Sequence, residues 1–337
     1  MANLKTRYLG LELGNPFVAG ASGLTARMDT IRRLEDAGAA ALVCSSLFEE
    51  QIQLESFVLQ EELHRYDNRH AEMLDLFPDI EHSGPDEHLM WVRRAKEAVS
   101  IPVIASLNAV NQETWVRYAG LLAETGADAL ELNFYATPDS LERSGAEIEA
   151  EQVEIVREIR AGVSLPLSVK LSASYANPLA QVRALEEAGA DGFVLFNRFL
   201  QPDIDVEAER NVLRHVLSTQ ADQGPALRYT GLLAGRIRGD ICAGSGIMQA
   251  ADAVKMLLAG AACVQVVSSL YKEKVSHLST LKRDLAAWME KKNYAGLTDF
   301  RGKLCAANNP DPWAFRRAQY VRLLMGRDQV LKSYPAP

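Results

Sequence analysis

Apolar residues at helical spacing, a glycine and then a short apolar run follow one another four times along the chain. Glycine often ends a helix because it adopts positive φ without strain, and a short apolar run is typical of a buried strand. Each segment therefore predicts the end of a helix followed at once by a strand. The segments are residues 34–40, 122–128, 185–191 and 257–262, with glycines at Gly38, Gly126, Gly189 and Gly260.

Four more apolar runs lie between these segments and predict four further strands. They cover residues 17–21, 103–106, 167–171 and 241–243, and the first three follow Pro16, Pro102 and Pro166. The residue before a proline favours extended backbone, so a proline is a natural entry into a strand. Eight strands that alternate with helices predict a closed (β/α)8 TIM barrel, and an open doubly wound sheet is the alternative.

The segments outside this rhythm are predicted to decorate a single barrel domain over residues 1–337. Residues 6–14 alternate and contain two glycines, which predicts a hairpin that closes the bottom of the barrel. Two insertions, at about residues 47–87 and 198–229, leave from the carboxyl ends of strands, where such barrels hold their active sites. They are lid candidates, or else solvated excursions. The tail at about 306–337 predicts a loop and then an amphipathic helix from about Trp313, packed on the barrel or on a partner subunit.

A glycine-rich turn stands between two of the predicted strands. The strand at 241–243 stops at Gly244-Ser245-Gly246, a helix follows, and the next strand ends at Ser268 and Ser269. Small residues, hydroxyls and free backbone N–H groups at the ends of neighbouring parallel strands suit an anion, most often a phosphate. A tight turn with nothing bound explains the same residues equally well, since one glycine-rich turn is a weak signal.

Polar residues at three other strand ends predict a second group of functional side chains. Within SVKLS, alternation places Lys170 on the face opposite to the leucines and valine, so its side chain is expected in the lumen near the mouth. A lysine there suits a Schiff base, a fixed positive charge beside an anionic cofactor, or a structural ion pair. Glu131 and Asn133 share a strand face, and Asn197 ends the sixth strand. Two amides and a lysine at one mouth suit a planar heterocycle, because each amide both donates and accepts.

Composition excludes several kinds of partner. The 337 residues carry a net charge of −8, which argues against nucleic acid. No apolar run is long enough to span a membrane, and residues 1–10 lack the apolar segment of a signal peptide, so we expect a cytoplasmic protein with no membrane partner. The four cysteines stand singly, which predicts reduced thiols and no zinc site.

With these motifs in order, residues 5–305 resemble the class 1 dihydroorotate dehydrogenase family. The matching pieces are NPFVAGASG (15–23), CSSLFEEQ (44–51), ELNFYATP (131–138), LSVKLS (167–172), FNRF (196–199), AGSGI (243–247) and VQVVSSL (264–270). Residues 291–304, KKNYAGLTDFRGKL, are similar to that family's C-terminal helix pair. The order and spacing of these pieces make the resemblance far more specific than any one motif.

The resemblance implies an oxidoreductase of pyrimidine metabolism: a homodimeric FMN-binding barrel with a small-molecule substrate and an electron acceptor that the sequence does not identify. It places the phosphate in the glycine turn and Lys170 near the pyrimidine edge of the flavin, where a positive charge stabilises the reduced ring. Lys170, Asn133 and Asn197 are then the candidate catalytic residues. The implied FMN contacts are Ala21, Ser22, Ser45, Asn108, Asn133, Lys170, Asn197, Gly224, Gly244, Ser245, Gly246 and Ser268.

Departures from the family pattern fall on the substrate side of the site. The family has a cysteine or serine as general base in the segment after the fourth strand, and here Ala136 stands at that position. Pro138 replaces a substrate-binding amide, and Cys44 stands where the family has a lysine. The resemblance therefore covers the flavin side better than the dihydroorotate side, as in a divergent branch of the family.

Three functions remain open from the sequence. The first is an FMN-dependent oxidoreductase that acts on the CH–CH group of a small planar substrate, with dihydroorotate itself in doubt. The second is a flavin-binding or electron-transfer partner without turnover of its own, which the missing base favours. The third is a Schiff-base lyase that uses Lys170 and holds a substrate phosphate in the glycine turn.

Overall fold

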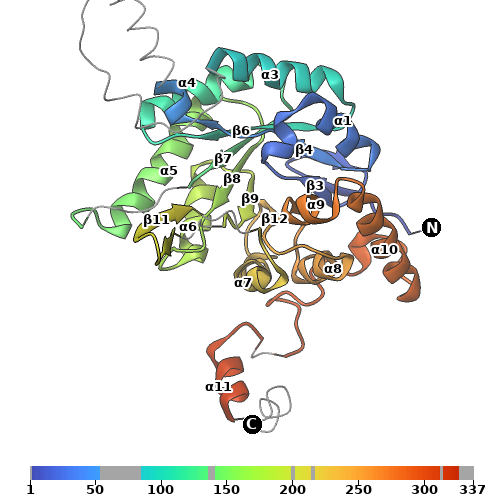
Figure 1. The fold of residues 1–337 in the computed structure, drawn as a ribbon. Coiled ribbons are helices and arrows are strands. Elements are labelled where there is room, and N and C mark those ends of the chain that lie inside the picture. The colour runs from blue at the N-terminus through green and yellow to red at the C-terminus, as the bar shows by residue number, and fades with distance from the viewer. Residues whose placement is uncertain are drawn as a thin grey trace, which may run out of the picture.

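Short strands that are buried on both faces form the centre of the molecule, as expected for a parallel sheet covered by helices. A computed structural model describes residues 2–53, 85–135, 141–198, 202–213, 217–311 and 314–325. Eight parallel strands follow one another in the sheet, and the pairing of β4 with β6 closes it into a barrel (Figure 1). They are β3 (Phe17–Ala19), β4 (Ala41–Val43), β6 (Val103–Asn108), β7 (Ala129–Asn133), β8 (Leu167–Leu171), β9 (Gly192–Leu195), β12 (Asp240–Ala243) and β13 (Cys263–Val266). The predicted TIM barrel is confirmed.

Helices surround the barrel and connect its strands (Figure 1). They are α1 (Met28–Asp36), α3 (Pro85–Ala98), α4 (Gln112–Ala123), α5 (Gly145–Gly162), α6 (Pro178–Ala188), α7 (Gly224–Leu233), α8 (Ala250–Ala259), the short α9 (Ser268–Glu273) and α10 (His277–Lys291). The four glycines predicted to end helices all have positive φ, and Gly189 and Gly260 are the left-handed caps of α6 and α8. The repeated helix–glycine–strand segments therefore have the predicted structure.

The alternation of each strand sends side chains to two different apolar layers. Leu167, Val169 and Leu171 of β8 belong to the large cluster between the sheet and the helices. A smaller cluster fills the lower lumen and contains Tyr8, Cys242 and Cys263. All four cysteines are buried and free, as the sequence predicted.

The predicted N-terminal hairpin closes the barrel at the end opposite to its mouth. Strands β1 (Thr6–Tyr8) and β2 (Leu11–Leu13) pair antiparallel. The backbone N–H of Leu9, in the turn, donates to Asp240 Oδ2 at 2.9 Å, at the start of β12. The hairpin therefore plugs the amino-terminal ends of the strands and leaves the carboxyl ends for ligands.

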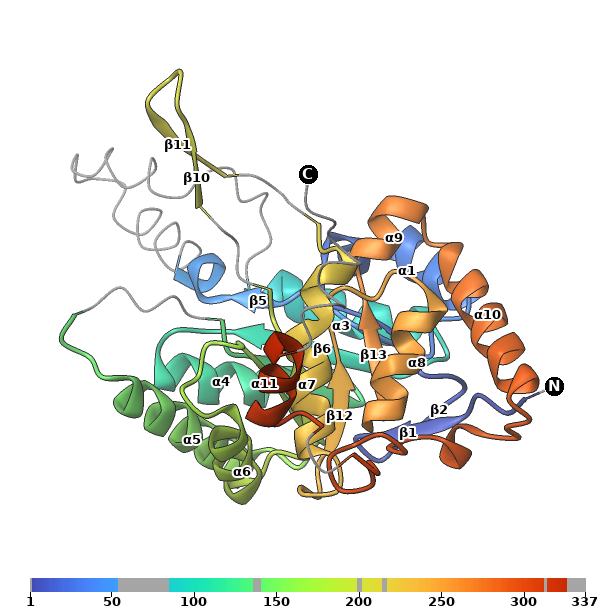
Figure 2. The same cartoon turned by 90° about the horizontal axis from the view of Figure 1, so that it is seen from below.

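The two insertions do leave from carboxyl ends of strands, but their bounds differ from those predicted. The first begins with β5 (Leu47–Phe48), which pairs with β6, and α3 already starts at Pro85; residues 54–84 lie outside the described part. The second contains the antiparallel hairpin of β10 (Pro202–Asp205) and β11 (Arg210–Leu213), which projects from the barrel end away from β1 and β2 (Figure 2). It is shorter than predicted, because Gly224 and Pro225 already open α7, a regular barrel helix. That either insertion is a lid stays a prediction.

Of two expectations about the C-terminal region, the helix pair was wrong, whereas the tail does form a helix and its packing on a partner subunit stays a prediction. Residues 291–304 do not form a helix pair: α10 ends at Lys291, Asn293 adopts a φ of 58°, and only the single turn η4 (Leu297–Asp299) follows. Helix α11 (Arg317–Met325) begins four residues after Trp313 and lies clear of the barrel helices in Figure 1. Its apolar side chains Leu323 and Leu324 are each 56% exposed, so they do not pack on the barrel.

Candidate active site at the barrel mouth

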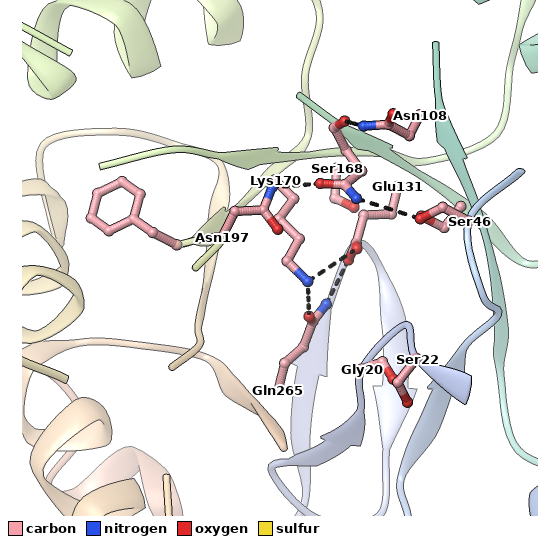
Figure 3. Close-up of polar contacts among 12 residues, drawn as sticks. Gly20, Ser22, Ser46, Asn108, Glu131, Ser168, Lys170, Asn197 and Gln265 are labelled. Carbon is pink, nitrogen blue, oxygen red and sulfur yellow. Dashed lines mark hydrogen bonds and ion pairs between the residues drawn. The ribbon is translucent and has the colours of Figure 1, made fainter. Parts of the chain in front are cut away.

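Amide side chains from three strand ends meet at the mouth of the barrel (Figure 3). Asn197 Nδ2 donates to Asn133 Oδ1 at 2.5 Å, which joins the segment after β9 to the end of β7. Asn108, the last residue of β6, donates from Nδ2 to the backbone carbonyl of Asn133 at 2.7 Å. The predicted convergence of Asn133 and Asn197 is confirmed as a geometry, and Asn108 belongs to the same group.

A pair of serines continues this network on the side of β4. Asn133 Nδ2 lies 3.4 Å from Ser46 Oγ, and Ser46 Oγ lies 2.8 Å from Ser106 Oγ. Both serines are buried. The sequence prediction named the neighbouring Ser45 as an FMN contact; Ser45 is half-buried, and that role stays a prediction. The shift by one residue reverses the side of an extended chain, so Ser46 is the residue that reaches the amides.

Lys170 enters the lumen from β8, as alternation predicted. Its Nζ donates to Gln265 Oε1 of β13 at 3.1 Å and lies 3.9 Å from Glu131 Oε1 of β7. Gln265 Nε2 in turn donates to Glu131 Oε2 at 2.5 Å. Burial raises the pKa of the Glu131 carboxyl, and Lys170 and Gln265 oppose that effect. The ammonium of Lys170 is thus held in place below the amide network.

The glycine turn lies beside a second loop and forms a cup with it. Ser245 and Gly246 have φ values of 64° and 73°, and Gly246 approaches the second loop so closely that an added Cβ would lie 2.6 Å from Thr219 O and 2.9 Å from Gln223 N. We call residues 244–246 with residues 218–224 the glycine cup. Within the described residues, the backbone N–H groups of Ser245 and Gly246 have no hydrogen-bond partner. Free amides in a left-handed turn suit an anion.

Three other predicted contacts are part of this cup or border it. Gly224 is the first residue of α7 and follows the loop directly. Ser268 Oγ accepts from the backbone N–H of Ser218 at 3.0 Å and lies 2.7 Å from Ser218 Oγ. An added Cβ at Gly244 would lie 3.5 Å from Phe196 O, an ordinary contact distance, whereas an added Cβ at Gly224 would find no atom within 4 Å.

A buried carboxylate holds the cup together. Asp252 of α8 accepts from the backbone N–H groups of Met248 and Gln249 at 3.1 and 3.0 Å, and from Gln220 Nε2 at 3.0 Å. Lys255 Nζ is a further donor at 3.2 Å. Burial alone would raise the pKa of Asp252, but these hydrogen bonds outweigh it and keep that pKa below its ordinary value. Asp252 therefore ties the glycine turn to the loop at 218–224.

The remaining residues singled out in the sequence do not join the network. Ala21 packs on the lumen cluster, and Ser22 Oγ donates to Gly20 O at 3.2 Å, just before the turn η1 (Gly23–Ala26). Cys44 is buried in the layer between sheet and helices, where burial raises the pKa of its thiol to about 12. That side chain does not face the mouth. Ala136 and Pro138 lie outside the described residues.

Sequence reasoning missed Gln265, Ser46 and Ser106. Gln265 stands between Val264 and Val266 in a buried strand, so its polar side chain must face the lumen. That signal was present in the sequence, because an amide inside an otherwise apolar run requires a partner. The serines carried no comparable signal, since a hydroxyl near a strand end is commonplace.

Comparison with known proteins places this chain in a family. Residues 77–289 match the family described as "Dihydroorotate dehydrogenase". The chain belongs to the dihydroorotate dehydrogenase family. It is 28% identical over 310 residues to "Dihydroorotate dehydrogenase B (NAD(+)), catalytic subunit" of Thermoplasma volcanium, which covers 90% of this chain and 98% of that protein. It is also 30% identical over 213 residues to "Dihydroorotate dehydrogenase A (fumarate)" of Lacticaseibacillus paracasei, covering 60% of this chain and 71% of that protein.

The resemblance stated from the motifs is therefore confirmed at the level of the family. The relatives carry names of both the NAD(+) and the fumarate type, so they do not identify one electron acceptor for this chain. Among the described residues, no helix combines the length and apolar character needed to cross a membrane. The homodimer and the cytoplasmic location stay predictions.

Proposed function

We propose that this protein is an FMN-dependent oxidoreductase that acts on the CH–CH group of a small planar substrate. The observation that supports this most strongly is the placement of Lys170. A buried strand delivers its ammonium to the mouth of the barrel, directly below two hydrogen-bonded amides. Membership of the dihydroorotate dehydrogenase family agrees with that assignment.

The residues at the mouth fit FMN in both charge and shape. The glycine cup offers free N–H groups, the Ser268 hydroxyl and open space at Gly224, all of which suit a terminal phosphate. Lys170, Asn133 and Asn197 offer a positive charge and paired donors and acceptors, which suit the polar edge of a flavin ring. The predicted contacts Ala21, Ser22, Ser45 and Asn108 come from the carboxyl ends of β3, β4 and β6, on the same mouth.

Each group has a distinct task in this proposal. FMN, when bound, would accept the two electrons of a hydride. Lys170 places a fixed positive charge near the ring, and Gln265 and Glu131 hold it there. Asn133 and Asn197 orient a planar ligand, because their mutual hydrogen bond leaves each amide with further donors or acceptors. Asp252 keeps the glycine cup in shape.

A visible absorption spectrum of the purified protein tests the cofactor. We expect a yellow protein that releases FMN, and not FAD, when it is denatured. In this proposal the cup holds the terminal phosphate of FMN, where FAD would carry an adenylate instead. A colourless protein that stays colourless after FMN is added would contradict the flavin assignment altogether.

Dihydroorotate is not the substrate that we propose. Its oxidation requires removal of a proton from one carbon while hydride leaves the neighbouring carbon. A positioned general base contributes about 10²–10⁴-fold to such a step. Ala136, at the base position of the family pattern, has no titratable atom. We therefore expect slow or no oxidation of dihydroorotate.

Anaerobic stopped-flow mixing of oxidised protein with excess dihydroorotate measures this directly through bleaching of the flavin. Bleaching at a rate typical of the family would overturn the expectation and direct attention to Tyr135 or to the insertion at 47–87 as the source of a base. If no bleaching occurs, Ala136→Cys alone should restore little, since Pro138 also removes a substrate contact in the family pattern.

A second candidate function is electron transfer without turnover of a small molecule, and Ala136 is the observation that favours it. A scan of small planar CH–CH donors separates the two candidates: reduction of the bound flavin by any of them supports the oxidoreductase. A Schiff-base lyase has less support, because Lys170 would first have to leave its bond to Gln265. Covalent trapping of a carbonyl substrate on Lys170 by borohydride would support the Schiff-base lyase instead.

A further inference from the structure

Three polar side chains from three different strands form a closed group in the lumen just below the mouth (Figure 3). Gln265 Nε2 donates to Glu131 Oε2 at 2.5 Å, and Lys170 Nζ donates to Gln265 Oε1 at 3.1 Å. The third side of the group is the ion pair between Lys170 Nζ and Glu131 Oε1 at 3.9 Å. We call Glu131, Gln265 and Lys170 the lumen triad.

The triad has one exposed end. The side chain of Glu131 is 1% exposed and that of Lys170 is 13% exposed, so only the lysine reaches toward the mouth. A carboxylate only accepts hydrogen bonds and an ammonium only donates them. The Gln265 amide therefore has one orientation that satisfies both neighbours: its NH₂ toward Glu131 and its oxygen toward Lys170.

The backbone at Gly20 lies close to the Gln265 amide. Gly20, directly after β3, lies so close that an added Cβ would be 3.1 Å from Gln265 Oε1 and 2.8 Å from Val267 Cγ2. The side chain of Gln265 is thus confined between the backbone near Gly20 and the two charged groups. Because the Gln265 amide is bonded to both charged groups, the position of Glu131 fixes where the amide can hold Lys170.

Glu131 is not needed there for packing. Its Oε1 atom is buried and has no hydrogen-bond partner among the described residues. A buried carboxyl with an unsatisfied oxygen is costly, and a buried ion pair by itself contributes little to stability. Other lumen positions are filled by apolar residues, among them Val18, Ile104 and Val194, and an apolar residue would fill this position too. The carboxyl is therefore better explained by what it does to Lys170.

We infer that Glu131 and Gln265 are positioning residues that hold the Lys170 ammonium at the mouth and set the net positive charge that a bound anionic ring meets. The inference rests on the proposed flavin site. Gln265 fixes the position of the ammonium, because its Oε1 atom accepts the hydrogen bond from Lys170 Nζ. Glu131 orients Gln265 and offsets part of the lysine's charge.

Two substitutions separate these tasks. Glu131→Gln keeps the size and an acceptor oxygen for Gln265 but removes the negative charge. The midpoint potential of the bound flavin should then rise by at least about 30 mV, a tenfold change for a two-electron couple. Gln265→Leu keeps a similar volume but frees the lysine, so the Kd for FMN should rise about tenfold, as loss of a charged hydrogen bond does.

Ser168→Ala is the matched control. Ser168 lies two residues before Lys170 on β8 and is fully buried. It is the register partner of Glu131 on β7, but its hydroxyl donates to the backbone carbonyl of Leu130 at 3.2 Å and not to a side chain of the triad. We expect this variant to leave the potential and the FMN affinity unchanged. An unchanged or lowered potential in Glu131→Gln would overturn the charge-setting role, and unchanged FMN affinity in Gln265→Leu would overturn the positioning role.

A measurement on flavin-free protein distinguishes failure of this inference from failure of the proposed function. The rate at which acetic anhydride modifies Lys170, followed by mass spectrometry, reports how firmly the lysine is held. Gln265→Leu should speed that reaction about fivefold over Ser168→Ala. If the protein binds no flavin but the rate increases, the triad positions Lys170 for another ligand. If the rate is unchanged, Gln265 does not hold Lys170.

Discussion

The two sides of the barrel mouth recognise a ligand by different means. On one side, Lys170, Asn133 and Asn197 present side chains that other side chains hold in place. On the other, the glycine cup presents backbone N–H groups, and its shape depends on left-handed conformations at Ser245 and Gly246. The first side can lose a functional group and keep its geometry. The second binds chiefly through backbone N–H groups, which no substitution removes, so substitutions act on it by changing its geometry.

The comparison predicts opposite responses to substitution. A conservative change on the lysine side should alter binding and leave the fold intact, whereas a single methyl group added at the crowded Gly246 of the cup should alter both. Substitutions chosen on each side therefore test whether the difference is real.

The largest effect is expected for Gly246→Ala. The substitution adds a Cβ 2.6 Å from Thr219 O, and it forces alanine into a φ of 73°. Left-handed backbone costs about 1–2 kcal/mol and overpacking about 1–3 kcal/mol, so the free energy of unfolding should fall by roughly 2–5 kcal/mol. Urea unfolding followed by circular dichroism measures this. Gly244→Ala is the control, since its φ is not positive and its Cβ has room: it should keep the stability and lose FMN affinity.

Lys170→Met should have the next largest effect, and on binding. Methionine keeps the length of the side chain but cannot donate to Gln265 or attract an anionic ring. Loss of a charged hydrogen bond of about 1.5–3 kcal/mol raises the Kd for FMN roughly 10- to 150-fold. Fluorescence titration of flavin-stripped protein measures the Kd. A Kd and a reduction potential equal to those of the parent protein would show that the charge near the flavin comes from elsewhere.

Asp252→Asn should lower the free energy of unfolding by about 1–3 kcal/mol, because an NH₂ group then replaces one carboxylate oxygen among the donors that surround it, which include the N–H groups of Met248 and Gln249. The pKa of Asp252 is lowered in the folded protein, so its stabilisation is present above its ordinary pKa of 3.8 and is lost as the pH falls below that value. The difference in unfolding free energy between parent and variant should therefore shrink toward low pH. A difference that stays constant from pH 7 to pH 3 would show that the charge of Asp252 is not involved.

The smallest effect is expected for Asn197→Ala, which removes one amide of the pair at the mouth. Asn133 keeps its contacts with Ser46 and Asn108, so the network loses one neutral hydrogen bond, about 0.5–1.5 kcal/mol. The Kd for FMN should rise no more than about tenfold, without a change in the melting temperature. A collapse of stability on the scale of Gly246→Ala would show that the two sides do not differ as described.

The amino-acid sequence by itself determined the barrel and the strands that carry the site. Period-two alternation in β8 placed Lys170 in the lumen, because successive side chains of a strand point to opposite faces. Glycines after helices and prolines before strands marked the boundaries. Glycine adopts the positive φ that ends a helix, and proline favours extended backbone in the residue before it. Such signals act within a few residues and need no knowledge of the rest of the fold.

Only the tertiary structure decided which polar residues meet. Glu131 and Lys170 lie on the neighbouring strands β7 and β8, but Gln265 lies on β13 and reaches them only because the sheet closes into a barrel. The path of the chain after β4 decides that Ser46 contacts Asn133 and Ser106. The turn after α10 depends on the positive φ of Asn293. Closure of a barrel and the fine twist of a strand end are set by the packing of the whole molecule, and no local pattern encodes them.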